Sequence, residues 1–179
     1  PEDRLVRLRA MNAAARREVA ARLKAQRPDF VLVIAGEGPA TPSLQRQVLR
    51  DGLAGTVRFV GYLERRKRLP DCYAAADVFV FASRTETQGL VLLEAMAAGL
   101  PVVGLAAMGT TDILGPERGA RIAPDSPEGF ATVVEDVIAN GRLRKQLATE
   151  ARSYAREWAD TVMAERLAAL YRRQLEGRA

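Results

Sequence analysis

Two carboxylates, Glu86 and Glu94, flank the expected start of a helix. Residues 90–98 are strong helix formers, and they are apolar nearly all round, which predicts a helix buried in the protein. Glu94 is the one charge in this run, and a lone buried carboxylate costs free energy unless other groups hydrogen-bond it. A loop glutamate and a helical glutamate around one helix start are suited to holding the polar groups of a ligand.

The helix start itself has the features of an anion site. Thr87 is a good N-cap, because its hydroxyl can accept a hydrogen bond from a backbone N–H one turn into the helix. Unpaired N–H groups and the helix dipole favour an anion there, and Gly89 has no side chain to keep a phosphate from the backbone. Leu90 shares a helix face with Glu94. We interpret the stretch as a phosphate site with a carboxylate at each end.

A purely structural alternative places the same helix in the core, with Glu86 in solvent and Glu94 paired with an arginine. Carboxylates in general fit that alternative. Here a loop glutamate, a glycine at the helix start and a lone helical glutamate occur together, and this combination favours the ligand site.

These residues also carry a family resemblance. Residues 83–90 (SRTETQGL) and 94–103 (EAMAAGLPVV) resemble the paired-glutamate motif of the retaining GT-B glycosyltransferases called group 1. The resemblance implies a nucleotide-sugar site in which Glu86, the catalytic residue, contacts the donor sugar and Glu94 contacts the ribose hydroxyls. It also implies that the amides of Gly89 and Leu90 bind the diphosphate, within a donor-binding stretch that includes Thr87 and Gln88.

Two other loops are similar to the same family. The first is residues 36–39 (GEGP), and the second follows an expected strand at residues 61–63. The resemblance implies that Gly61, Tyr62 and Leu63 offer backbone groups to the nucleotide base. For Tyr62, a surface aromatic without a ligand is the alternative.

Alternating β-prone and helical segments predict an α/β fold with a doubly wound parallel sheet. The strands are expected at residues 30–35, 56–60, 77–81, 102–105 and 120–123. The helices are expected at residues 1–26, 43–51, 69–76, 90–98, 128–139, 143–158 and 161–175. The resemblance covers residues 28–173 and implies the Rossmann-like C-terminal half of a GT-B fold, with C-terminal helices. We expect a single domain over residues 1–179, with residues 1–27 as an atypical N-terminal helix.

One part of the family pattern is not expected here. In the family, this half begins with a strand that ends in an arginine, followed soon by a lysine, and the two neutralise the donor diphosphate. No stretch before Phe30 is expected to be such a strand, so neither Arg4 nor Lys24 is given the role. The family's acceptor-binding N-terminal half also lies outside this sequence, so the isolated chain is expected to bind a donor without transferring its sugar.

Composition narrows the remaining possibilities. The chain has 179 residues with one cysteine and no histidine, which excludes an internal disulfide and argues against a zinc site. We expect no cofactor and no metal, with a nucleoside-diphosphate sugar as substrate. The net charge of +5 suits an anionic ligand, but aromatics make up only 6% and are not interleaved with basic residues, so no nucleic-acid partner is expected. No run of residues has the length or pattern of a membrane span or a signal peptide, and a cytoplasmic location is expected.

The densest charge run is residues 64–68 (ERRKR). A solvated surface explains it most simply, and contact with an anionic membrane surface is the alternative. The resembling family is more acidic here, so the run is a departure in this chain. Two functions remain open: a domain of an enzyme that transfers a hexose from a nucleotide sugar to a glycolipid, polysaccharide or other glycoconjugate, and a non-catalytic module that kept the fold and binds nucleotides or anionic surfaces.

Overall fold

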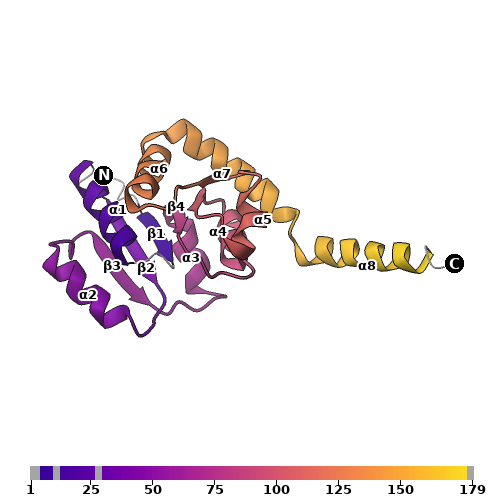
Figure 1. Ribbon diagram of the computed structural model, residues 1–179, viewed down its shortest axis with the longest axis horizontal. Helices are drawn as coiled ribbons and strands as arrows, with labels where there is room; N and C mark the ends of the chain where they lie inside the picture. The colour runs from indigo at the N-terminus through magenta and orange to yellow at the C-terminus, as the bar shows by residue number, and fades with distance from the viewer. Residues whose placement is uncertain (1–4, 10–12, 27–29, 177–179) are drawn as a thin grey trace.

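Figure 1 shows the computed structural model, which describes residues 5–9, 13–26 and 30–176. Six parallel strands form one sheet in the order β3-β2-β1-β4-β5-β6. The strands are β1 (Leu5–Arg9), β2 (Val31–Ala35), β3 (Val57–Gly61), β4 (Ala76–Phe81), β5 (Val102–Gly104) and β6 (Ala120–Ile122). The chain winds outward in both directions from the β1–β4 pair, so the predicted doubly wound α/β fold is confirmed.

Strand β1 corrects the expectation for the start of the chain. One helix was predicted over residues 1–26, but Leu5–Arg9 form a central strand that pairs with both β2 and β4. The helix α1 begins only at Ala13. Alanine and arginine give the segment a high helix propensity, which here loses to the backbone hydrogen bonds available between two flanking strands. The chain therefore does contain, before Phe30, a strand that ends in an arginine.

Apart from α1, the predicted helices are confirmed, with ends shifted by no more than two residues. They are α1 (Ala13–Gln26), α2 (Thr41–Arg50), α3 (Arg68–Ala74), α4 (Leu90–Ala97), α5 (Thr111–Leu114), α6 (Pro127–Ala139), α7 (Gly141–Arg156) and α8 (Asp160–Glu176). A 3-10 turn, η1 (Met108–Thr110), leads into α5, and both were missed from the sequence.

The core has two layers because successive side chains of a strand point to opposite faces. On β4, Val78 and Val80 join the cluster that includes residues of α1 and α6, whereas Phe79 and Phe81 join the cluster beneath α3, α4 and α5. All four side chains are buried, as expected for a parallel strand covered on both sides. The second cluster fixes α4 against the sheet.

The last helix differs from the others. Figure 1 shows α8 extending away from the body of the fold, and none of its residues is buried. Within the described residues, no helix is long and apolar enough to cross a membrane.

Candidate functional site

A pocket of about 290 Å³ lies where the strands β2 and β3 end and α4 begins. Ligands of open α/β sheets bind at the carboxyl ends of the strands, so this pocket is the first candidate for a site. Its walls come from the loops after β2 and β3, from α4, and from α3 with the turn before it. The lining residues are Ala35, Gly36, Tyr62, Leu63, Arg65, Leu69, Leu90, Val91 and Glu94.

The loops after β2 and β3 are tied together at one wall. The amide of Gly36 donates to the carbonyl of Gly61 at 2.8 Å, and the amide of Tyr62 donates to Oε1 of Glu37 at 3.3 Å. Gly61 has φ +65, and a Cβ there would lie 3.0 Å from the same Glu37 oxygen. A glycine is therefore needed for the loop to turn this close. The side chain of Leu63 is buried in the wall, whereas Tyr62 is 71% exposed.

Glu94 stands on α4 with a partner at each carboxylate oxygen. The guanidinium of Arg65 pairs with Oε1, and the hydroxyl of Tyr73 donates to Oε2 at 3.4 Å. The side chain of Glu94 is 26% exposed, so it is neither alone nor sealed in the core. The arginine partner is the feature that the structural alternative predicted, yet the same carboxylate lines the pocket.

Glu86 holds the backbone at the start of α4. Its Oε1 accepts hydrogen bonds from the amides of Gln88 and Gly89, both at 3.1 Å. The prediction of Thr87 as N-cap is wrong: Gly89 takes that place with φ +68, and no side-chain hydrogen bond caps the helix from it. A left-handed residue just before the helix suits glycine. The Gly89 amide, expected to bind a diphosphate, donates to Glu86 in this structure, while Leu90 occupies the first turn of α4.

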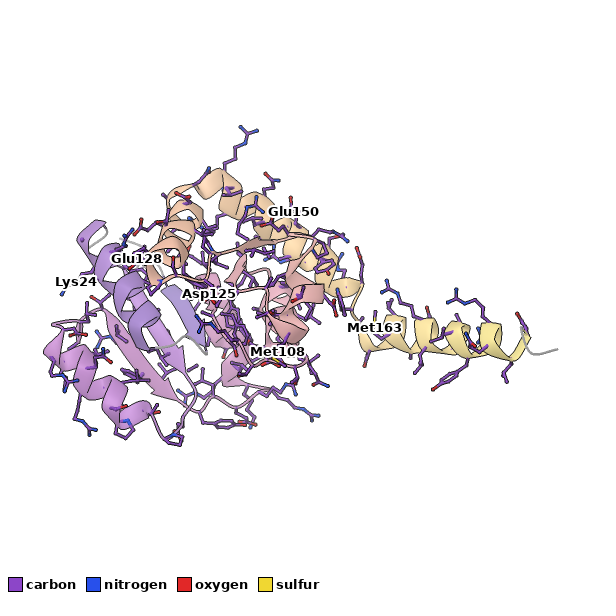
Figure 2. The ribbon with its side chains drawn as sticks, in the orientation of Figure 1. Lys24, Met108, Asp125, Glu128, Glu150 and Met163 are labelled. Atoms are coloured by element: carbon purple, nitrogen blue, oxygen red, sulfur yellow. The ribbon has the colours of Figure 1, made fainter. Side chains whose placement is uncertain are left out.

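The loop that carries Glu86 is held from two sides. Arg84 pairs with Asp125, which is labelled in Figure 2, at 2.6 Å, and this hydrogen bond raises the pKa of the arginine. On the other side, the amide of Gly109 donates to the carbonyl of Glu86 at 3.0 Å. A Cβ on Gly109 would overlap the carbonyl of Thr87, so only glycine permits this approach.

A family model described as glycosyl transferases group 1 matches residues 16–154, which is most of the chain. The chain belongs to this family. It is 34% identical, over 125 residues, to the lipopolysaccharide core biosynthesis glycosyltransferase LpsE of Rhizobium meliloti. That match covers 69% of this chain and 36% of the relative, so the chain spans about a third of the relative's length.

Solved structures of glycosyltransferases share the fold. The Anabaena protein HepE, solved in complex with UDP and glucose, has a TM-score of 0.77 at 22% identity, covering 95% of this chain and 48% of HepE. The C-terminal domain of a glycosyl transferase group 1 family protein from Francisella tularensis has a TM-score of 0.75 at 24% identity. There the match covers 86% of this chain and 85% of the other. The GT-B assignment made from the sequence is confirmed.

In this group 1 domain, the pocket brings together some of the predicted site residues and leaves others outside. Tyr62, Leu63, Leu90 and Glu94 line it, and Gly61 sets the turn of its wall. The other predicted residues are on the loop before α4, outside the lining: Glu86, Thr87, Gln88 and Gly89.

Sequence reasoning missed three residues of the site. Arg65 was seen only as part of a charge run, and neither Tyr73 nor Gly109 was singled out. A glycine in the loop that follows the expected strand at residues 102–105 was a usable signal for Gly109. Nothing in the local sequence marks Arg65 or Tyr73, because each contacts Glu94 from more than twenty residues away. Within the described residues, no cluster of histidine, cysteine, aspartate or glutamate is arranged to hold a metal ion.

Proposed function

We propose that this chain is the donor-binding domain of a retaining glycosyltransferase, and that the pocket beside Glu94 takes a nucleoside-diphosphate hexose. One observation carries the proposal: a carboxylate, an apolar wall and a helix N-terminus converge on one pocket at the carboxyl edge of a parallel sheet. HepE, which has the same fold, was solved with UDP and glucose, and this supports a nucleotide sugar as the ligand.

Each part of the donor has a matching group. The base lies against the wall of Tyr62 and Leu63, and the ribose hydroxyls donate to Glu94. The diphosphate lies at the start of α4, where the first-turn amides and the helix dipole favour an anion. Strand β1 ends at Arg9 on the same edge of the sheet, where the family has an arginine that neutralises the diphosphate. By its place at the end of β1, Arg9 is our proposal for the cation that was not expected from the sequence.

Glu86 is the residue proposed to meet the transferred sugar. A carboxylate can accept about four hydrogen bonds, so one carboxylate can hold the amides of Gln88 and Gly89 and also receive sugar hydroxyls. The chemistry rests on electrostatic stabilisation of the leaving diphosphate by the helix N-terminus and the cation of Arg9. No metal is invoked. The acceptor is a glycolipid, polysaccharide or other glycoconjugate held by a second domain, so we expect no sugar transfer by these residues alone.

Thermal shift and calorimetry with the diphosphates of uridine, guanosine and adenosine, and with their sugars, test the proposal. We expect at least one nucleotide to bind, and Glu94→Gln to weaken it about tenfold or more, because hydrogen bonds to a charged group contribute roughly 1.5–3 kcal/mol each. Glu165→Gln, on the exposed helix α8, is the matched control and should change nothing. A folded chain that binds none of these ligands, or binds them equally well without the Glu94 carboxylate, would refute the proposal.

A further inference from the structure

The two partners of Glu94 differ in how firmly the fold holds them. Tyr73, which donates to Oε2, is only 4% exposed, and its ring packs edge-on against Phe79 with centroids 5.8 Å apart. Arg65, which pairs with Oε1, has a side chain that is 70% exposed and comes from the turn before α3. One oxygen therefore has a fixed donor, and the other has a donor that can leave.

Arg65 also stands at a boundary between two hollows. A second hollow of about 380 Å³ lies beside the pocket, lined by Arg65, Leu69, Pro70, Tyr73, Glu94, Ala97 and Ala98. The residues that it shares with the pocket are Arg65, Leu69 and Glu94. The ion pair of Arg65 with Glu94 thus lies at the pocket edge, on the carboxylate that the proposed function gives to ribose hydroxyls.

An ion pair whose arginine is largely exposed is a weak competitor for such a carboxylate. Ion pairs at exposed positions favour the paired state by a factor of about five at most. Hydroxyl groups that donate to a carboxylate inside a pocket contribute about tenfold or more. A ligand that brings hydroxyls to Glu94 can therefore displace Arg65. Its net binding free energy is reduced by the free energy of the ion pair that it breaks.

We propose that Arg65 is a displaceable counter-ion of Glu94, and that it sets the affinity of the pocket for ribonucleotides. The residue pairs with the carboxylate until ribose hydroxyls replace the guanidinium. A ligand without these hydroxyls leaves the ion pair in place, so the ion pair does not change the affinity of the pocket for that ligand. This inference rests on the proposed function, because it needs the ribose to meet Glu94.

Comparing variants of Arg65 and Arg66 separates the effect of the ion pair with Glu94 from the effect of losing one positive charge. Arg66 is the matched control, because it is the next residue in the same run, is exposed, and forms no ion pair with any described residue. Arg65→Ala and Arg66→Ala each remove one positive charge from the same run, but only the first removes the ion pair with Glu94. We expect Arg65→Ala to bind UDP about two- to fivefold more tightly than Arg66→Ala.

Three ligands, measured by calorimetry, complete the test. The probes are UDP, its 2′-deoxy counterpart and inorganic pyrophosphate, with GDP and ADP run beside UDP. The gain in affinity of Arg65→Ala relative to Arg66→Ala should be about two- to fivefold for UDP, smaller for the deoxy ligand and absent for pyrophosphate. Arg65→Gln, a second variant that removes the charge but keeps a polar side chain, should bind UDP more tightly than Arg66→Gln.

The outcomes that overturn the inference are distinct from failure of the proposed function. Equal UDP affinity in Arg65→Ala and Arg66→Ala, or weaker binding in Arg65→Ala, would show that the pair does not compete with the ribose. An equal gain for UDP and pyrophosphate would assign the effect to charge alone. In each of these cases the wild type still binds UDP in a manner that depends on Glu94. If instead no nucleoside diphosphate binds the wild type, the proposed function and this inference fail together.

Discussion

Glu86 and Gly89 are joined by a hydrogen bond from the glycine amide to the glutamate carboxylate at 3.1 Å. The first of the two glutamates therefore holds the residue just before α4, and the second, Glu94, lies one turn inside that helix. The carboxylate of Glu86 is thus connected, through the start of α4, to the helix that carries Glu94. Any ligand contact made by Glu86 is coupled to the position of the α4 amides.

Substitutions of Glu86 should separate its structural and ligand roles. Glu86→Gln keeps an acceptor for the two amides, so we expect the fold and the affinity for a bare nucleoside diphosphate to be nearly unchanged. The affinity for the nucleotide sugar should fall, because the proposed contact is to the sugar. Glu86→Ala leaves both amides without their acceptor and should lower the free energy of unfolding by about 1–2 kcal/mol.

Calorimetry with diphosphate and with nucleotide sugar, and urea unfolding, measure these effects. Glu94→Gln is the contrasting variant, because it should weaken both ligands alike. Equal losses for both ligands in Glu86→Gln and in Glu94→Gln would mean that the two glutamates do not divide the donor between them.

Gly109 gives a prediction about the loop beside the site. An added Cβ would overlap the carbonyl of Thr87, and backbone cannot move aside as a flexible side chain does. We expect Gly109→Ala to destabilise the protein by about 1–3 kcal/mol and to weaken nucleotide-sugar binding, because the loop of Glu86 is displaced. Gly55→Ala is the control, since a Cβ there meets no atom within 4 Å. Thermal unfolding of both variants measures the effect, and equal melting temperatures would show that the loops are not packed this tightly.

The buried parts of the sheet were predictable from sequence because their pattern is local. The apolar run around Phe79 favours burial. The glycine and proline that follow α4 end this helix regardless of its tertiary contacts. Strand β1 was not predictable in this way. Its residues favour a helix as much as a strand, and only pairing with β2 and β4, which are far away in the sequence, decides between the two.

Some features of the candidate site were likewise predictable from the local sequence, and others were not. Glu94 and the turn at Gly61 follow from a contiguous motif and from a glycine after a strand. The pairing of Arg65 with Glu94 does not, because an exposed arginine in a charged run can point in many directions. Its partner depends on how the turn before α3 is placed over α4, which is a property of tertiary packing.

The ion pair of Arg118 with Glu157 predicts a pH dependence of stability away from the site. Two hydrogen bonds, at 2.6 and 2.8 Å, join the guanidinium to the carboxylate, and they lower the pKa of Glu157 below its usual 4.5. A carboxyl with a depressed folded pKa stabilises the protein above its unfolded pKa and loses that contribution as pH falls through the folded pKa. The contribution should therefore be complete well above the unfolded value of 4.5, should decrease as pH falls below it, and should be lost once pH is below the folded pKa of Glu157.

Melting temperatures of wild type and Glu157→Gln across pH 3–7 check this. The variant should melt at a lower temperature near neutral pH, and the two curves should converge in acid. The difference should be small, because the pair is on the surface. Glu165→Gln should follow the wild type throughout. A difference between wild type and Glu157→Gln that stayed constant down to pH 3 would assign the effect to packing instead of charge.

The basic run gives the last prediction, which concerns membranes. Residues 65–68 are all exposed, and Lys67 pairs with Glu64 at 3.6 Å, while Arg66 and Arg68 form no ion pair with any described residue. Each basic residue near an anionic surface contributes on the order of 1 kcal/mol, and salt weakens the attraction. We expect the chain to co-sediment with phosphatidylcholine vesicles that contain phosphatidylglycerol, and Arg66→Glu with Arg68→Glu to reduce this at least about tenfold. The control makes the same charge change on α7, with Arg142→Glu and Lys145→Glu. If binding is equal for pure phosphatidylcholine and for anionic vesicles at low salt, or falls equally in both double variants, the run is a solvated surface and no membrane contact is assigned to it.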